Sequence, residues 1–306
     1  LFLRSGARTL PGTLVPLPEL ANTYEYLAQH GPEGFYRGPL AEAVLASLDG
    51  WMSAQDLASY RVRWRPPLSM DWRGGRLHTV SSPSAGGLQL LQMLGLMERR
   101  GSPSQSLEDN SHWLAEAMRI SFRDRCQSAG DPDFQGPDPE PYLSKEWFED
   151  WSNQMALESI LQLTGPTLAY STGGTASHAV ASADGGVVVI TESLNHWFGS
   201  FVVPRGTGIL LNNIMDDFTT HRHRPDGFHL APAPWNLVEG GKRPVSSSTP
   251  AVWMLDGRPR LVVGSAGGPR ITTSVAQILL NSVWHGYNIQ QAVHAPRLHH
   301  QWYPDH

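Results

Sequence analysis

The sequence contains a single cysteine, Cys126, and only two lysines, Lys145 and Lys242. One thiol excludes an intrachain disulfide and a zinc site built from cysteines. The other basic residues are arginines scattered along the chain and the net charge is -5, which excludes a basic surface for nucleic acid and a polybasic membrane anchor. No apolar run approaches the ~20 residues that a bilayer span needs, so we predict no membrane-spanning helix.

The chain has ample material for a hydrophobic core, because 40% of its 306 residues are apolar and only 17% are charged. This length allows one large or two medium domains. The chain begins with Leu1 rather than methionine, lacks the residue order of a signal peptide and stops in the aromatic and apolar stretch 299–306. We therefore expect a piece of a longer polypeptide.

Helical periodicity dominates the first half of the chain. Apolar residues recur at helical spacing from Pro18 to the stop signal Gly31-Pro32, and Ser53 with Asp56 is a capping signal for a further helix. The predicted helices cover residues 18–30, 39–48, a short segment after 53, 88–97, 107–126 and, near the end of the chain, 271–284.

Short strands and turn signals dominate the second half, after a stretch rich in glycine, serine and threonine at 165–174 that we predict to be a boundary. Asp184-Gly185-Gly186 is typical of a hairpin turn, since glycine tolerates positive φ. Helices, then strands, then a closing helix favour an α+β fold in which helices cover sheets. The predicted strands cover residues 76–80, 178–182, 187–191, 201–203, 209–211, 251–255 and 261–263.

Thr175 follows Gly173-Gly174 and opens the first of the later strands. A threonine hydroxyl is a weak nucleophile at neutral pH and needs a base beside it. If the Gly174–Thr175 bond is cut, the freed α-amino group, with a pKa near ~8, can serve as that base for its own residue. Taken alone, Gly-Gly-Thr is more often a loop before a strand.

Further motifs follow Thr175 in a characteristic order and spacing. They are Ser193-Leu194-Asn195, the segment 211–218 with its paired acids, the serine-rich segment 242–250, the glycine-rich segment 264–270 and the segment 295–302. With segments 31–38, 56–60 and 83–87 of the first half, this set resembles the γ-glutamyltranspeptidase family of N-terminal nucleophile hydrolases. Members of that family cut themselves in two and begin the small subunit with the catalytic threonine.

The resemblance implies an α+β fold, the αββα four-layer sandwich of the N-terminal nucleophile hydrolases, here incomplete at both ends. It implies that residues 1–174 are the later, mainly helical part of the large-subunit region and residues 175–306 the sheet-rich small-subunit region, both made from one precursor. It further implies no cofactor, export to the periplasm or the cell exterior, and small-molecule partners: a γ-glutamyl substrate such as glutathione, with water or an amine as acceptor.

Carried over residue by residue, the resemblance implies Thr175 as the nucleophile and Ser193 as the side chain that hydrogen-bonds its hydroxyl. The backbone N–H groups of Gly267 and Gly268 would form the oxyanion hole. Glycine suits this role because it lets the backbone approach a tetrahedral intermediate closely, and such donors contribute ~3 to 4 kcal/mol to transition-state stabilisation.

The resemblance also implies the substrate-binding residues. Asn195 and Asp217 would lie around the α-amino and α-carboxylate ends of the substrate, and Ser246 and Ser247 would hold its carboxylate. Ile214 departs from the pattern, because the family usually has glutamine or glutamate there to meet the α-amino group. Asp217 is then the main anion for a substrate ammonium, and the apolar neighbour favours a less polar acyl group.

Two alternatives stay open. Ile214 favours an acylase of the same fold that acts on glutaryl or cephalosporin-type amides. A non-catalytic relative is the other alternative, because Ala176 and Ser177 alter the usual residues after Thr175 and because the terminal regions of the family pattern are absent.

The remaining candidate groups are interpreted as structural. His221, His223 and the pair His299-His300 have no carboxylate or cysteine at a metal-ligand spacing, so no metal site is predicted. Cys126 lies on an apolar helix and is predicted to be a core thiol.

Overall fold

The computed structural model describes residues 3–4, 7–101, 107–134, 136–163, 173–220, 226, 228 and 230–303. The chain divides into two compact units. The first unit comprises Leu1–Trp64 and Phe198–Asn213, and the second comprises Arg65–Trp197 and Ile214–His306. The predicted division between residues 174 and 175 concerns cleavage of the chain rather than compactness, and it stays a prediction.

The first unit is mainly helical. Its elements are β1 (Leu3–Arg4), β2 (Ala7–Arg8), α1 (Pro18–His30), α2 (Glu33–Tyr36), α3 (Pro39–Ala46) and α4 (Ala54–Ser59). The predicted capping signal is confirmed, because Ser53 Oγ accepts from the Asp56 N–H while the Asp56 carboxylate accepts from the Ser53 N–H. A small core of Ala41, Val44 and Leu57 packs α3 against α4.

Two strands predicted in the first unit, 201–203 and 209–211, are wrong. Two backbone hydrogen bonds of 2.9 Å join the segments, from the Ser200 N–H to the Leu211 carbonyl and from the Leu211 N–H to the Val202 carbonyl, but neither segment forms a strand. Phe201 has φ +60°, which lies outside the extended region, so the chain turns where a strand would have to run straight.

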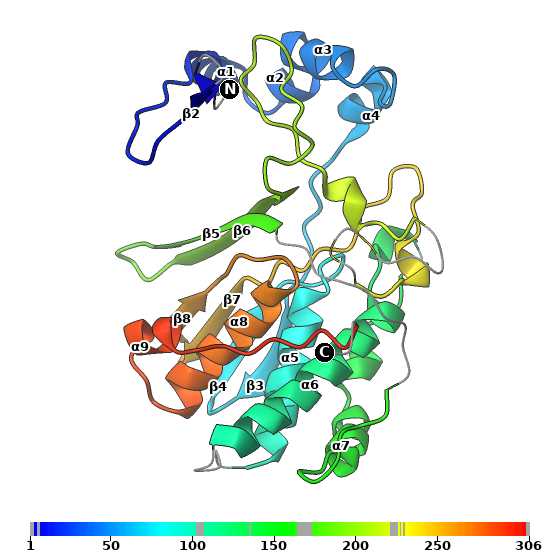
Figure 1. Cartoon of the computed structure of the whole chain (residues 1–306), viewed down its shortest axis with the longest axis vertical. Coiled ribbons are helices and arrows are strands. Elements are labelled where there is room, and N and C mark those ends of the chain that lie inside the picture. The colour runs from blue at the N-terminus through cyan, green and yellow to red at the C-terminus, as the bar shows by residue number, and fades with distance from the viewer. Residues whose placement is uncertain are drawn as a thin grey trace. The chain divides into compact units, whose positions relative to one another are not determined.

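The second unit is built on a four-stranded antiparallel sheet with the order β3-β4-β7-β8 (Figure 1). Its strands are β3 (Leu68–Trp72), β4 (Gly75–Thr79), β7 (Ala251–Leu255) and β8 (Arg258–Val263). Strands β4, β7 and β8 confirm the predicted strands 76–80, 251–255 and 261–263. Thr79 of β4 lies opposite Ala251 of β7, so the sheet joins segments that are far apart in the sequence.

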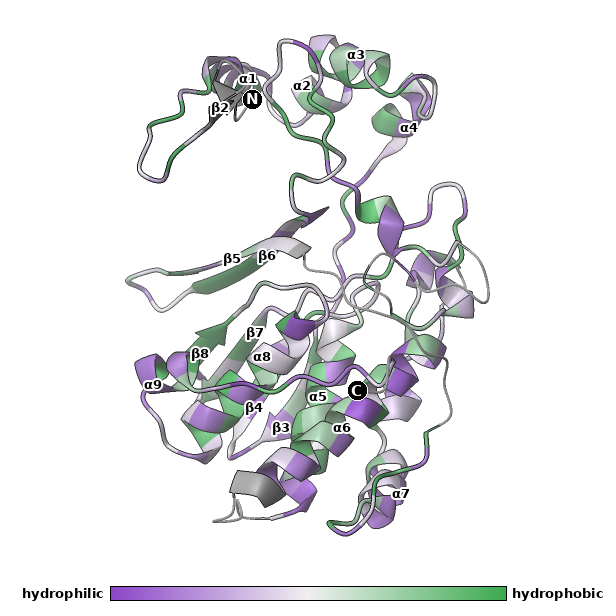
Figure 2. Cartoon of the chain, in the orientation of Figure 1, coloured by the Kyte–Doolittle hydropathy of each residue, from purple (hydrophilic) through white to green (hydrophobic). Residues whose placement is uncertain are grey.

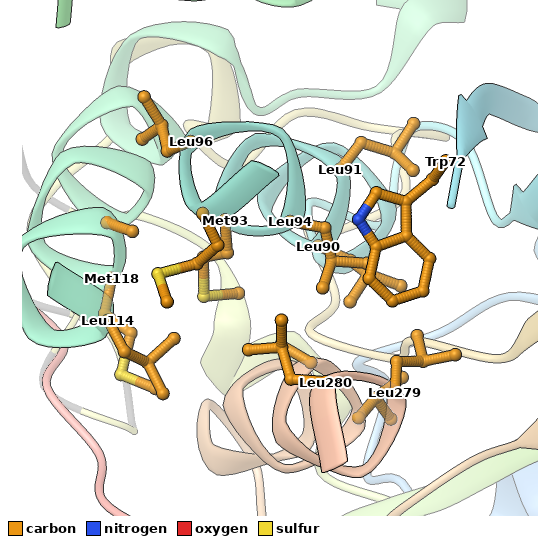
Figure 3. Close-up of a cluster of buried hydrophobic side chains, with 14 of the residues drawn as sticks. Trp72, Leu90, Leu91, Met93, Leu94, Leu96, Leu114, Met118, Leu279 and Leu280 are labelled. Atoms are coloured by element: carbon orange, nitrogen blue, oxygen red, sulfur yellow. The ribbon is translucent and has the colours of Figure 1, made fainter. Parts of the chain in front are cut away.

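Helices cover one face of this sheet (Figure 1). Helix α5 (Gly86–Arg99) packs against α6 (Leu107–Ser128), α8 (Arg270–Leu279) and β3, and its residues from Gly86 to Met97 are buried. Leu90, Leu94 and Met93 of α5 face Met118 and Leu279 in the main hydrophobic core (Figure 3). The long apolar run of α5 therefore makes it the central helix of the unit.

Shorter elements complete the second unit. They are the 3₁₀ helices Pro132–Phe134, Glu140–Leu143, Ile214–Asp217 and Pro234–Asn236, helix α7 (Lys145–Gln154), the π-helical turn Leu280–Trp284 and helix α9 (Ile289–His294). The sequence patterns did not predict α7. Its Phe148 packs on Gly95 of α5 so closely that a Cβ at Gly95 would lie 2.3 Å from the ring. The missing side chain of Gly95 thus makes room for α7.

A hairpin of β5 (Gly173–Ala181) and β6 (Val187–His196) carries the predicted threonine. The predicted glycine turn is confirmed, with Gly185 at φ +93°. Thr175 pairs with Ser193, and the register shifts between Gly174 and Thr175. The hairpin carries both hydrophobic and hydrophilic residues (Figure 2), and it approaches the sheet at Gly264, where a Cβ would lie 1.8 Å from the Ser177 hydroxyl oxygen.

The second unit confirms the α+β class. It contains a helical layer, a four-stranded sheet and the hairpin, which together form an incomplete αββα sandwich. Among the described residues, no helix combines the length and the apolar character needed to cross a membrane.

Cys126 lies near the end of α6, as its apolar surroundings predicted. Its Sγ lies 3.7 Å from the Phe122 carbonyl oxygen and 3.6 Å from that of Ala231. Burial raises the pKa of the Cys126 thiol to about 12.

Candidate active site

The hydroxyl of Thr175 lies in a hydrogen-bonded chain at the open end of the hairpin. Thr175 Oγ1 is 3.0 Å from Ser193 Oγ, which donates to the Gly174 carbonyl oxygen at 2.9 Å and accepts from the Asn195 N–H at 2.8 Å. A serine hydroxyl has one proton, and here the Gly174 carbonyl receives it. Thr175 must therefore be the donor in its contact with Ser193, which leaves the lone pairs of Thr175 Oγ1 available for attack.

The hairpin places these groups through its backbone geometry. Cross-strand pairing sets Thr175 opposite Ser193, and the register shift falls at the Gly174–Thr175 bond. Such irregularities in a strand pair re-aim a side chain and are frequent beside active sites. Asn195, near the end of β6, has φ +78° and is buried.

Asn195 and Asp217 are directly bonded to each other. Asn195 Nδ2 donates to Asp217 Oδ1 at 2.8 Å, and both side chains are buried. Burial raises the pKa of Asp217 to about 7, and the charge of Asp226 adds to the increase, whereas the Asn195 hydrogen bond and the Arg125 charge oppose it. Asp217 thus changes its charge near neutral pH.

The serine segment 246–248 is held by the loop before α5. The Ala85 N–H donates to the Ser246 carbonyl at 3.0 Å, and the Ser84 hydroxyl donates to the Ser248 carbonyl at 2.6 Å. A Cβ on Gly86 would lie 2.2 Å from the Thr249 hydroxyl oxygen, so only glycine allows this approach. The motif at 83–87 therefore positions the serines.

Gly267 and Gly268 lie just before α8 and have φ +120° and +59°. Their carbonyls accept from the N–H groups of Arg270 and Ile271, which begin the helix. A Cβ on Gly268 would lie 2.7 Å from the ring of Phe228. Backbone conformation and space both require glycine at residue 268, and the start of α8 adds a favourable dipole for negative charge.

One cavity collects seven of the eight predicted site residues. They are Thr175, Ser193, Asn195, Asp217, Ser246, Ser247 and Gly268. Gly267 is not among the residues that line this cavity. Ile214 does line it, so the departure seen in the sequence lies beside the polar groups.

The cavity also contains residues that the sequence patterns missed. Its further lining residues are Arg125, Phe228, Ser248 and Ile271. Arg125 is 6% exposed, its Nη2 lies 4.0 Å from Asp226 Oδ2, and its Nη1 has no hydrogen-bond partner among the described residues. Arg125 lies on α6, whose apolar periodicity indicated only a core helix. The one signal that could have marked Arg125 as a site residue was its charge at the end of such an apolar helix.

The described residues contain no group of three or more histidine, cysteine, aspartate or glutamate side chains that could hold a metal ion. His299 Nδ1 is 2.9 Å from the Thr273 hydroxyl oxygen, and its Nε2 is 3.0 Å from Gln301 Oε1. Burial lowers the pKa of His299 to about 4, so this ring is neutral at physiological pH. His221 and His223 lie outside the described residues.

Comparisons with known proteins agree with these motifs. The chain is 33% identical over 314 residues to the "Glutathione hydrolase proenzyme" of Escherichia coli (strain K12), covering 100% of this chain and 54% of that protein. It is 38% identical over 298 residues to the protein of the same name from Pseudomonas aeruginosa, covering 94% and 53%. It is 31% identical over 303 residues to the "Acylase ACY 1 proenzyme" of Pseudomonas sp. (strain SE83), covering 97% and 52%.

Among solved structures, a cephalosporin acylase from Bacillus halodurans matches with a TM-score of 0.82 and 28% sequence identity, covering 96% of this chain and 52% of that chain. The chain thus spans about half the length of the curated relatives it matches. The family model described as Gamma-glutamyltranspeptidase matches residues 1–306. On this evidence, the chain belongs to the γ-glutamyltranspeptidase family.

Proposed function

We propose that the full-length protein is a threonine-nucleophile enzyme that matures by cutting its own Gly174–Thr175 bond and then cleaves γ-glutamyl amide bonds. The observation that carries this proposal is the hydrogen-bonded chain from Thr175 through Ser193 to the Gly174 carbonyl, at the edge of the cavity that holds Asp217 and the serines.

Maturation begins with attack of Thr175 Oγ1 on the Gly174 carbonyl carbon. Ser193 hydrogen-bonds the carbonyl oxygen and so favours the negative charge that develops there. The Gly174–Thr175 C–N bond breaks, the nitrogen takes the hydroxyl proton and an ester remains between Gly174 and Thr175. Water then hydrolyses the ester, which leaves a carboxylate on Gly174 and a free α-amino group on Thr175. The relatives' names as proenzymes support this step.

Turnover then uses the same hydroxyl on a substrate. Thr175 Oγ1 attacks the amide carbon, and its α-amino group takes the proton and gives it to the leaving amine. The N–H group of Gly268, which lines the cavity, stabilises the oxyanion together with that of the adjacent Gly267. Water or a second amine accepts the acyl group from the ester and restores Thr175. No step needs a metal or a cofactor.

The polar residues of the cavity account for recognition of a γ-glutamyl group. Asp217, held by Asn195, offers a carboxylate to the substrate ammonium when it is ionised. Ser247 offers hydroxyl and backbone donors to the substrate carboxylate, beside Ser246, whose own hydroxyl donates to Ser248 Oγ at 3.0 Å. The names of the glutathione hydrolase relatives support glutathione and similar compounds as substrates.

A second candidate is an acylase for glutaryl or cephalosporin-type amides. Ile214 replaces a polar partner of the ammonium, and Asp217, with a pKa of about 7, is partly neutral at physiological pH. Both features suit an acyl group without an ammonium. The acylases among the relatives and solved structures support this candidate as well.

One experiment separates these candidates from each other and from a non-catalytic relative. The full-length protein and its Thr175→Ala variant are compared by intact mass and by turnover of γ-glutamyl and glutaryl p-nitroanilides. We expect two chains divided before residue 175 and a preference for the γ-glutamyl compound, both absent in the variant. A preference for the glutaryl compound indicates the acylase, and an uncut, inactive parent protein contradicts the enzyme proposal.

A further inference from the structure

The cavity presents two polar walls that come from different parts of the chain. The ammonium wall consists of Asn195 and Asp217, and the carboxylate wall consists of Ser246 and Ser247. A substrate that carries both an ammonium and a carboxylate on one carbon must touch both walls at once. The distance between the walls therefore affects how well such a substrate binds.

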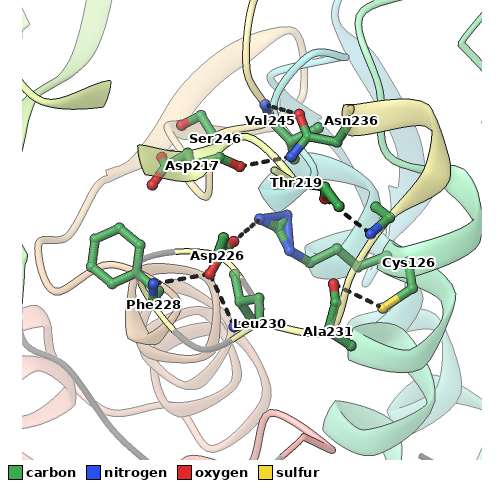
Figure 4. A network of polar contacts seen from close by, with 12 residues as sticks. Cys126, Asp217, Thr219, Asp226, Phe228, Leu230, Ala231, Asn236, Val245 and Ser246 are labelled. Carbon is green, nitrogen blue, oxygen red and sulfur yellow. Dashed lines mark hydrogen bonds and ion pairs between the residues drawn. The ribbon is translucent and has the colours of Figure 1, made fainter. Parts of the chain in front are cut away.

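Asn236 connects the backbones of the two walls. Its Nδ2 donates to the Asp217 carbonyl oxygen at 2.7 Å, and its Oδ1 accepts from the Val245 N–H at 3.0 Å (Figure 4). The residue is 3% exposed, so water does not compete for these bonds. Asn236 contacts the residue before Ser246 and the backbone of Asp217 itself, yet it does not line the cavity.

Asn236 is itself fixed by its surroundings. Its carbonyl accepts from the Thr219 N–H at 2.9 Å, and the Thr219 hydroxyl accepts from the Ala233 N–H at 3.1 Å. These bonds join the segment that follows the 3₁₀ helix Ile214–Asp217 to the 3₁₀ helix Pro234–Asn236. On the opposite side, the Ser246 N–H donates to the Pro83 carbonyl. The loop before α5 thus anchors the carboxylate wall, and the Asn236 amide links that wall to the backbone of Asp217.

We propose that Asn236 is a positioning residue that holds the ammonium wall and the carboxylate wall at a fixed spacing and thereby favours acyl groups that carry both charges. The role needs a donor and an acceptor on one planar group, which asparagine supplies and an apolar residue of similar size does not. This inference rests on the proposed function for its substrates, although the positioning itself can be measured without them.

The first test compares KM and kcat of the full-length protein and its Asn236→Ala variant on γ-glutamyl and glutaryl p-nitroanilides. The glutaryl group has no ammonium and touches only the carboxylate wall. We expect the KM of the γ-glutamyl compound to rise about tenfold, the KM of the glutaryl compound to change less than about twofold, and kcat to stay within about threefold for both. An equal rise of KM for both compounds overturns the proposal.

Gln277→Ala is the matched control. Gln277 is also a buried amide that joins two backbone segments, from Thr273 to Leu298, but it does not line the cavity. We expect it to lower stability and to leave the ratio of the two KM values at the parent value. A changed ratio in this control would show that any loss of a buried amide alters specificity, and it would overturn the assignment to Asn236.

Asn236→Asp adds a pH readout and guards against poor folding of the alanine variant. Protonated aspartic acid supplies one donor and one acceptor, whereas the ionised form has no donor for the Asp217 carbonyl. The quantity compared is the KM of the variant for the γ-glutamyl compound, divided by that of the parent protein at the same pH. For Asn236→Asp this quotient should approach 1 at pH 5.5, and at pH 8.5 it should match the quotient of Asn236→Ala.

Amide hydrogen exchange tests the positioning without substrate. In Asn236→Ala, exchange over 244–248 should be at least about tenfold faster than in the parent protein, while Gln277→Ala should leave it unchanged. If exchange is faster in Asn236→Ala but the parent protein turns over neither anilide, the proposed function is contradicted and the role of Asn236 in positioning is supported. Unchanged exchange overturns that role, whatever the activity.

Discussion

Asp217→Asn should stabilise the folded protein, although it replaces a residue of the proposed active site. Asp217 has an ordinary pKa of 3.8 when exposed and about 7 in the fold, mainly because of burial. Between these values the folded state binds a proton that the unfolded state does not. Stability therefore falls as pH rises from about 4 to about 7 and stays lower above that range.

The size of the effect follows from the shift. Roughly three pKa units at about 1.36 kcal/mol each give a cost near 4 kcal/mol at pH 8.5, where both states are ionised, and about 2 kcal/mol at pH 5. Asparagine is neutral at both values and can still accept the Asn195 hydrogen bond through its oxygen. The variant should thus be more stable than the parent by about these amounts.

The assay is urea unfolding followed by tryptophan fluorescence at both pH values, with the full-length protein in a Thr175→Ala background so that every sample is one uncut chain. Asp216→Asn is the matched control, since Asp216 is the exposed neighbour, and it should change stability by less than about 0.5 kcal/mol. The reasoning is refuted if Asp217→Asn gains nothing at pH 8.5, or gains the same amount at both pH values.

Four further outcomes are expected. Ser193→Ala removes the hydrogen bond to the Gly174 carbonyl and should slow maturation at least about tenfold on a denaturing gel; cleavage at the parent rate would contradict its role. Ile214→Gln should raise kcat/KM for γ-glutamyl relative to glutaryl anilide about tenfold, and a ratio that moves the other way would argue against the ammonium subsite. Gly268→Ala should lower kcat about a hundredfold through strain at φ +59°, and near-parent activity would exclude this backbone from the oxyanion hole. Leu94→Ala should cost about 2 to 5 kcal/mol of unfolding free energy without changing KM, and a loss below about 1 kcal/mol would contradict its place in the core.

Local signals in the sequence predicted much of the fold. The apolar run of α5, the capping pair Ser53 and Asp56 and the glycine turn of the β5–β6 hairpin each depend on neighbouring residues, and each is confirmed. Helix α7 was not predicted, although Ser144 caps its first turn by accepting from the Trp147 N–H. Its packing place depends on the gap at Gly95 on a distant helix. The hydrophobic periodicity of a helix does not show against which of its glycines another helix will pack.

The candidate site divides in the same way. The family resemblance, recognised from the order of the motifs, implied residues that the structure gathers around one cavity, from Thr175 to Gly268. Arg125 and Asn236 were missed for two different physical reasons. Arg125 is hidden in a helix whose pattern indicates packing alone, and Asn236 acts through backbone groups of Asp217 and Val245, so nothing in its own neighbourhood marks it.

The shielded thiol of Cys126 has a practical consequence for experiments in solution. With its pKa raised to about 12, this sulfur is almost entirely protonated at neutral pH and will react slowly with maleimides or iodoacetamide. Within these 306 residues no second cysteine competes for such reagents. A cysteine introduced on the exposed turn of the hairpin, for example at Asp184, would be the reactive thiol of these 306 residues, and a fluorophore on it can report on movement of the strand that bears Thr175.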